Sequence, residues 1–161
     1  MTTQKSILFV CTGNIFRSVS AELCLKKYLF ENGIFDWNVS SAGITAIPDA
    51  IDPQTLETLQ ELGIDATKHT QQKLTREMLA EYDVVIGMAE NHIAFMKSEF
   101  SYDSAILFNE LATQEKTSVL DIEDEIQNYL TNREAVKDKI ARTVREINDK
   151  IPSVFRNIPE R

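Results

Sequence analysis

A cysteine and an arginine separated by five residues stand between a predicted strand and a predicted helix, in the segment 10–18 with the sequence VCTGNIFRS. A tight loop at this place in an α/β fold turns successive backbone N–H groups inward, so that they can bind an anion. The helix that follows adds unpaired N–H groups and the positive end of its dipole. In this field Cys11 is expected to be a thiolate, the nucleophilic form of the side chain. The spacing therefore predicts a phosphate-binding loop that carries a nucleophile.

Two further side chains of the loop fit an attack on phosphorus. The planar guanidinium of Arg17 can bind two phosphate oxygens, a geometry that lysine lacks, and Ser18 can donate a hydrogen bond to the thiolate and help it leave in a second step. A cysteine after a buried strand is more often an inert core residue, but its place between a strand and a helix favours the catalytic interpretation. The predicted phosphate-binding residues are Thr12, Gly13, Asn14, Ile15, Phe16, Arg17 and Ser18.

Hydrophobic patterning indicates the elements that must position this loop. Residues 6–10 (SILFV) form a continuous apolar run, typical of a strand buried on both faces of a parallel sheet. Further strands are predicted over 37–41, 82–88 and 105–108, and helices over 21–29, between Asp52-Pro53 and Gly63, from Thr75, and over 90–99. Strands that alternate with helices predict right-handed crossovers and one three-layer α/β/α domain over residues 1–161, with a four-stranded parallel sheet.

The last part of the chain is predicted to be an amphipathic helix. Thr131 and Glu134 have the spacing of a capping box, with Thr131 as the cap. Apolar residues recur behind them at helical spacing and predict a buried stripe. This stripe consists of Val136, Ile140, Val144, Ile147 and Ile151.

Length and composition limit the class of protein. The chain has 161 residues, of which 43% are hydrophobic and 26% charged, which fits one globular domain. Its formal net charge of −8 disfavours nucleic acid as a partner. Apolar runs are far shorter than the ~20 residues of a membrane span, and no basic segment followed by an apolar stretch indicates a signal peptide. Two cysteines suit a reducing compartment, so we expect a cytoplasmic protein. We also expect a monomer, and keep weak self-association as an alternative.

Four short blocks accompany the loop along the chain: Ser41-Ala42-Gly43, Asp52-Pro53, residues 74–83 and Met88. Together with the loop, they resemble the low-molecular-weight protein tyrosine phosphatase family, whose loop reads roughly Cys-x-Gly-Asn-x-Cys-Arg-Ser-Pro. The resemblance covers nearly the whole chain. It implies hydrolysis of phosphotyrosine in protein substrates through a cysteinyl-phosphate, without a metal or a cofactor. It also implies a loop supported by hydrogen bonds from Asn14, Ser18, Ser41 and His69.

The chain departs from the family pattern at three positions. Phe16 replaces a second loop cysteine, Val19 replaces a proline, and Ala89 replaces an aspartate that supports the loop. In the family, the second cysteine can form a protective disulfide with the nucleophile. Because Cys11 and Arg17 are both present, we expect the chemistry to be kept and this protection to be lost.

Expulsion of a phenolate or alkoxide calls for a general acid. The family places an aspartate in a late loop before the last helix, and here residues 119–126 read VLDIEDEI, with no proline. Relatives that read Asp-Ile-Pro-Asp-Pro favour Asp124 as the acid, whereas relatives that read Val-Leu-Asp-Pro indicate Asp121. Acidic clusters also commonly coat a solvated loop. We expect Asp124 to be the acid and keep Asp121 as the alternative.

Other residues bear on the substrate. Ile15 stands where arginine phosphatases of the family carry threonine, which favours phosphotyrosine over phosphoarginine. Ile44 and Ile47 are expected to form one apolar wall of the cleft, and Ile126 and Gln127 stand where relatives have aromatic residues. Arsenate reduction would require further cysteines to relay a disulfide. Two alternatives stay open, an arginine phosphatase of the same family and a phosphate- or phosphopeptide-binding module with weak turnover.

No catalytic role is predicted for the two histidines or for the second cysteine. His69 matches a loop-supporting position, while His92 lies on a predicted exposed helix and is expected at the surface. Cys24 lies on the apolar face of the first helix and is expected in the core. Ligand residues do not cluster at metal-binding spacing, so no metal site is predicted.

Overall fold

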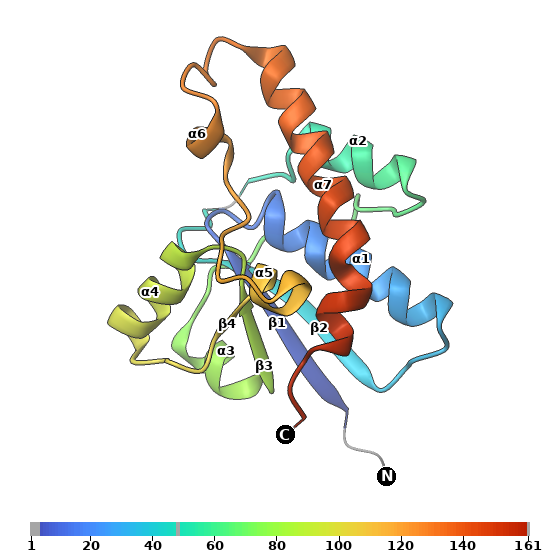
Figure 1. Cartoon of the computed structure of the whole chain (residues 1–161), viewed down its shortest axis with the longest axis vertical. Helices are drawn as coiled ribbons and strands as arrows, with labels where there is room; N and C mark the ends of the chain where they lie inside the picture. Colours follow the sequence, from blue (N-terminus) through green and yellow to red (C-terminus); the bar gives the residue numbers. More distant parts are fainter. Residues whose placement is uncertain (1–3, 48, 161) are drawn as a thin grey trace.

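The computed structural model describes residues 4–47 and 49–160 of the chain. Its four strands form one parallel sheet in the order β2-β1-β3-β4, which confirms the predicted sheet (Figure 1). The central strand β1 contains the apolar run of the sequence, and its residues 7–10 are fully buried because helices cover both faces. The strands are β1 (Lys5–Cys11), β2 (Trp37–Gly43), β3 (Val84–Gly87) and β4 (Ile106–Leu107).

Helices pack against both faces of the sheet and form a three-layer sandwich (Figure 1). Alternate residues of β1 point to opposite faces, so Ile7 and Phe9 belong to the larger core cluster, whereas Leu8 and Val10 belong to the smaller one. The larger cluster is covered by α1 (Arg17–Glu31), α5 (Phe108–Thr113) and α7 (Arg133–Arg156). The smaller one is covered by α3 (Arg76–Glu81) and α4 (Glu90–Phe100).

The long helix α7 buries the stripe that its periodicity predicts. Ile140, Val144, Ile147 and Ile151 are at most 2% exposed and lie in the larger core cluster. The predicted cap is wrong by one residue. Asn132, not Thr131, is the N-cap, because its side-chain oxygen accepts the N–H of Ala135 at 3.2 Å.

Two smaller helices flank the carboxyl ends of the strands. Helix α2 (Pro53–Glu61) begins at the predicted cap, where the Asp52 carboxylate accepts the N–H of Thr55 at 2.8 Å. The one-turn helix α6 (Ile122–Glu125) belongs to the segment that joins α5 to α7. Two salt bridges join α6 to α7: Glu125 Oε1 lies 3.2 Å from Lys139 Nζ, and Glu125 Oε2 lies 3.1 Å from Arg142 Nη2. The acidic loop is therefore tied to the helical layer rather than fully solvated.

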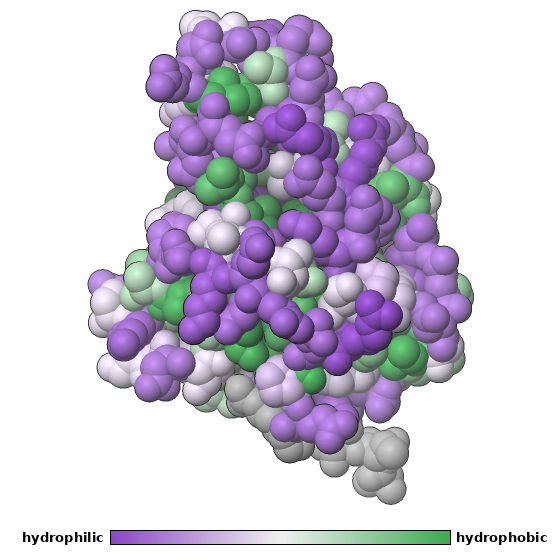
Figure 2. All heavy atoms as spheres, in the orientation of Figure 1, coloured by the Kyte–Doolittle hydropathy of each residue, from purple (hydrophilic) through white to green (hydrophobic). Residues whose placement is uncertain are grey.

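Hydrophilic residues cover most of the face shown in Figure 2, with small separate apolar areas between them. Across residues 4–47 and 49–160, none of the helices combines the length and the apolar character that crossing a membrane requires.

Candidate active site

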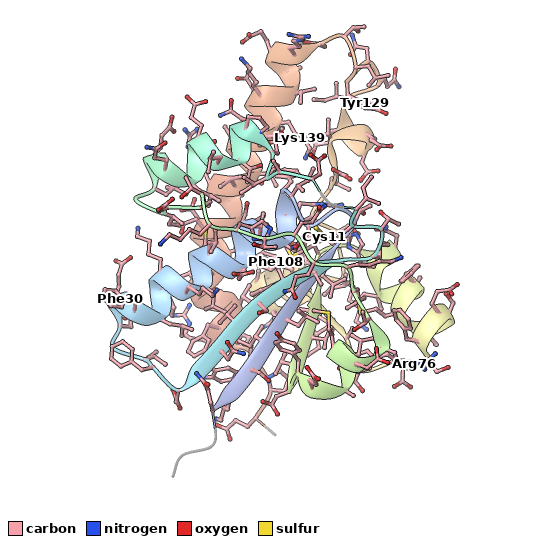
Figure 3. All side chains as sticks on the ribbon, turned by 180° about the vertical axis from the view of Figure 1, so that it is seen from behind. Cys11, Phe30, Arg76, Phe108, Tyr129 and Lys139 are labelled. Carbon is pink, nitrogen blue, oxygen red and sulfur yellow. The ribbon has the colours of Figure 1, made fainter. Side chains whose placement is uncertain are left out.

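The segment between β1 and α1 wraps around a small cavity. Cys11 ends β1 and Arg17 begins α1, and Figure 3 shows Cys11 where the strands end. The Sγ atom of Cys11 lies 2.9 Å from Ser18 Oγ and accepts the N–H of Asn14 at 3.3 Å. The cavity has a volume of about 190 Å³ and is lined by Cys11, Thr12, Gly13, Ile15, Phe16, Arg17, Asp52, Asp121 and Ile122.

The chemistry of the lining, and not its volume, marks this cavity as the candidate site. A larger cavity of about 420 Å³ lies beside Lys5, Trp37 and Val84, the first residues of three strands, and so at the opposite end of the sheet. In an open parallel sheet, ligands bind at the carboxyl ends of the strands. The smaller cavity is at that end.

Asn14 joins the loop to its surroundings. Its side-chain nitrogen donates to Ser18 Oγ at 2.9 Å and to Ser41 Oγ at 2.8 Å, and its backbone oxygen lies 2.9 Å from His69 Nε2. Asn14 adopts a positive φ of 57°, a left-handed conformation that asparagine tolerates better than most residues. Since Ser18 Oγ accepts from Asn14, its own proton is free to point at the Cys11 sulfur. The structure thus brings together all the predicted support residues.

Three further residues complete this support, and sequence reasoning missed them. Glu22, which is 8% exposed, accepts the hydroxyl of Ser41 at 2.6 Å. Gln72 N–H donates to Asn14 Oδ1 at 3.0 Å, and the Gln71 side chain donates to the backbone oxygen of Gly13. The one signal available in the sequence was the position of Glu22, one helical turn after Ser18 and so on the same face of α1.

Gly43 permits the end of β2 to touch the loop. A Cβ atom at this position would lie 2.6 Å from the backbone oxygen of Thr12 and 2.9 Å from the backbone nitrogen of Asn14. Both are backbone atoms, which cannot swing aside as a flexible side chain can. The close approach allows the N–H of Ile44 to bond to the Cys11 oxygen at 2.9 Å. This contact explains the glycine of the Ser41-Ala42-Gly43 block.

Arg17 is buried and held at both ends of its guanidinium. Its side chain is 3% exposed, and Nη1 donates to the backbone oxygen of Val119 at 2.8 Å. Nη2 donates to Asp121 Oδ2 at 3.1 Å and to Thr12 Oγ1 at 3.3 Å. The planar group is therefore fixed beside the cavity before any anion binds, which lowers the entropic cost of binding.

Of the two candidate acids, the structure places Asp121 at the cavity and Asp124 away from it. Asp121 lines the cavity and is paired with Arg17. Asp124 is exposed, and its Oδ2 accepts the N–H of Asp121 at 2.9 Å, as an N3 residue that caps α6. Long-range contacts set this arrangement, because Val119 donates its N–H to the oxygen of Met88 at 2.8 Å and accepts from Arg17.

His92 is buried, so its expected position at the surface is wrong. It is 0% exposed, in the first turn of α4, and its Nε2 lies 2.9 Å from Thr12 Oγ1. Burial, and then the charge of Arg17, lower the pKa of His92 to about 3. The prediction failed because α4 begins right after β3, so that its first turn faces the loop between β1 and α1 rather than solvent.

The apolar lining also differs from the expectation. Ile47 is 73% exposed, and Ile44 packs against the core cluster that contains Leu8 and Val10. Within the part of the chain that the structure describes, the large apolar side chains at the cavity are Ile15, Phe16 and Ile122. The apolar surface beside Asp121 therefore comes from Ile122 of α6.

Cys24 is 1% exposed, which confirms its place in the core. Burial raises the pKa of its thiol to about 12, so the side chain stays protonated and is a poor nucleophile. Phe16 occupies the loop position of a second cysteine and is itself buried at 6% exposure. Neither residue provides a reactive thiol for Cys11.

Peroxide is therefore expected to inactivate the protein irreversibly. An oxidised Cys11 that finds no thiol partner proceeds from sulfenic acid to the sulfinic and sulfonic forms, which thiol reductants do not reverse. The measurement is hydrolysis of an aryl phosphate before peroxide, after it, and after dithiothreitol, with Cys24→Ser as the control that should behave like the parent. Full recovery of the parent together with a Cys11–Cys24 disulfide in the mass spectrum would contradict this expectation.

Comparison with known families and structures agrees with this geometry. Residues 6–157 match the model of the family described as low molecular weight phosphotyrosine protein phosphatase. A YwlE mutant structure from Bacillus subtilis has a TM-score of 0.81 and 28% identity, covering 95% of this chain and 97% of the other. Another YwlE structure, described as an arginine phosphatase mutant with a phosphorylated active-site serine, has a TM-score of 0.80, 28% identity and coverage of 94% and 93%.

Proteins with other descriptions are also similar to this chain. A low molecular weight protein tyrosine phosphatase from T. tengcongensis has a TM-score of 0.79 and 28% identity, covering 96% of this chain and 100% of the other. Arsenate reductase 1 of Bacillus cereus is 40% identical over 88 residues, which are 55% of this chain and 61% of that protein. An arsenate reductase of Staphylococcus aureus is 36% identical over 89 residues, 55% and 63% of the two chains. The chain thus spans less than two thirds of the length of these reductases.

Proposed function

Because this chain belongs to the low molecular weight phosphotyrosine protein phosphatase family, we propose that it hydrolyses phosphotyrosine in protein substrates through a cysteinyl-phosphate. The observation that carries the proposal is the convergence of Cys11, Arg17 and Asp121 on one cavity. A nucleophile, a two-point anion clamp and a proton donor are the groups that transfer of a phosphoryl group from an aryl ester requires.

In the first step, the Cys11 thiolate attacks phosphorus and the bond from phosphorus to the tyrosyl oxygen breaks. The loop N–H groups and Arg17 bind the phosphoryl oxygens throughout, where negative charge is concentrated. We assign the general acid to Asp121, the alternative of the sequence interpretation, because it lines the cavity and Asp124 does not. Its protonated carboxyl group gives its proton to the departing phenolate.

In the second step, water attacks the cysteinyl-phosphate and the bond from phosphorus to sulfur breaks. Asp121, now a carboxylate, takes the proton of the attacking water. The Ser18 hydroxyl, 2.9 Å from Sγ, donates to the thiolate as it forms. The products are inorganic phosphate and the starting enzyme, so no external reductant or oxidant enters the cycle.

The lining of the cavity supports an aryl ester as the substrate. Ile15 and Ile122 line the cavity with Asp121 and offer apolar surface to a phenyl ring. A phosphoarginine side chain carries no ring to contact this surface. Reduction of arsenate by a cysteine relay fits the chain less well, because the second cysteine, Cys24, is buried in the core and its thiol stays protonated.

A comparison of phosphotyrosine and phosphoarginine peptides of the same sequence tests the assignment. We expect the parent protein to hydrolyse phosphotyrosine with the higher kcat/KM. Ile15→Thr should lower kcat/KM for phosphotyrosine by roughly tenfold, because a hydroxyl replaces apolar surface that contacts the ring. Ile15→Val keeps a branched apolar side chain and is the matched control. A parent that prefers phosphoarginine, or an Ile15→Thr variant with unchanged phosphotyrosine activity, would contradict the proposed specificity.

A further inference from the structure

His92 links the start of α4 to the phosphate-binding loop. The residue is completely buried, and both ring nitrogens have a partner. Nδ1 accepts the backbone N–H of Ala89 at 3.0 Å, which caps the helix, and Nε2 contacts Thr12 Oγ1 at 2.9 Å. The ring therefore connects a helix terminus on one side with the anion cavity on the other.

The contacts of the ring determine its tautomer. A backbone N–H can only donate, so Nδ1 carries no proton and Nε2 of the neutral ring carries the single one. The ring stays neutral at physiological pH, because burial and the charge of Arg17 lower its pKa to about 3. His92 is thus a permanent donor to Thr12 Oγ1 rather than a titrating group.

Thr12 connects His92 to the guanidinium of Arg17. Its Oγ1 accepts both from His92 Nε2 at 2.9 Å and from Arg17 Nη2 at 3.3 Å. The opposite arm of the guanidinium is held by the Val119 oxygen at 2.8 Å. Three acceptors therefore hold the plane of Arg17: the Val119 oxygen, the Thr12 hydroxyl, and the Asp121 carboxylate at 3.1 Å from Nη2. The Thr12 hydroxyl belongs to a side chain whose orientation the His92 contact specifies.

We propose that His92 is a positioning residue of the phosphatase reaction, which acts through Thr12 Oγ1 to hold the Arg17 guanidinium in the orientation that binds the phosphoryl oxygens. The inference rests on the proposed function for the identity of the reaction. His92 does not line the cavity, and its described hydrogen bonds go to Thr12 and Ala89 rather than to Cys11. A positioning role predicts weaker phosphate binding when the donor is removed, whereas a purely structural role predicts only a smaller folded fraction.

Two variants separate the two ring nitrogens. His92→Asn keeps an acceptor close to the place of Nδ1 for the Ala89 N–H, but its side chain is too short to reach Thr12. His92→Gln is one methylene longer and places an amide N–H close to the position of Nε2. If the helix cap were the important contact, His92→Asn would be the milder change. If the Thr12 contact matters, His92→Gln should be the milder one.

Calorimetric titration with inorganic phosphate provides the readout. For His92→Asn we expect the dissociation constant of phosphate to rise roughly tenfold, the size of one lost hydrogen bond, with a matching rise in KM for an aryl phosphate. His92→Gln should restore most of the affinity. Thr12→Val should weaken phosphate binding to a similar extent, and adding His92→Asn to it should change little further, because both changes remove the same contact.

The design separates positioning from loss of folded protein and from failure of the proposed reaction. A smaller folded fraction lowers kcat and the binding stoichiometry but leaves the dissociation constant unchanged, so unchanged phosphate affinity in His92→Asn would overturn the proposal. Equal losses in the Asn and Gln variants would overturn it as well. Phosphate binding requires no turnover, so a parent that binds phosphate but hydrolyses no aryl phosphate would count against the proposed function alone.

Discussion

Cys11→Ser is expected to abolish turnover of an aryl phosphate and to leave phosphate binding intact. The partners that the structure describes for Sγ, the Ser18 hydroxyl and the Asn14 N–H, can both donate to a thiolate. They stabilise an anion but cannot take the proton of a serine hydroxyl, which therefore stays a weak nucleophile. The loop N–H groups and Arg17 are unchanged and still bind the anion. The measurements are kcat for an aryl phosphate and the dissociation constant of inorganic phosphate.

The Cys11→Ser variant also tests which residue accepts the phosphoryl group. A phosphate found on that serine by mass spectrometry after incubation with substrate would place the acceptor at this position. Cys24→Ser is the matched control, because it removes the other thiol of the chain from a buried site outside the cavity. It should lose stability but keep the parent KM. Turnover by Cys11→Ser close to the parent rate would rule out the covalent mechanism.

Asp121→Asn is expected to slow hydrolysis of phosphotyrosine by ~10²–10⁴-fold, the range of general acid catalysis. The amide keeps the shape of the side chain but has no acidic proton for the phenolate. An activated phenol leaves without a proton, so the loss should shrink for p-nitrophenyl phosphate. The measurement is kcat/KM of the variant and the parent on both substrates.

Asp124→Asn is the matched control for this prediction. The residue lies three positions further along the same loop, is exposed and caps α6, and asparagine can still accept the Asp121 N–H through its side-chain oxygen. Activity within a few-fold of the parent on both substrates is expected. A loss that depends on the leaving group in Asp124→Asn, and not in Asp121→Asn, would move the acid to Asp124 and reject the assignment made from the structure.

Much of the fold and of the loop between β1 and α1 follows from the sequence by itself. The apolar run of residues 6–10, the Asp52-Pro53 helix start and the stripe on α7 are local patterns, and each appears in the structure as an element of the expected type. The loop at Cys11 was recognisable for the same reason. A strand, a turn and a helix N-terminus that are contiguous in the chain are enough to predict an anion-binding loop at this place.

The tertiary structure decided which distant residues serve that loop. Asp121 rather than Asp124 reaches the cavity because Val119 is fixed by the Met88 backbone and by Arg17, contacts more than 30 and 100 residues apart in the chain. His92 faces the loop instead of solvent because β3 directs the first turn of α4 toward it. Hydrophobic periodicity reports which face of an element is buried, but not which polar partner meets it there. Such partners depend on the register and packing of separate elements, which no local pattern encodes.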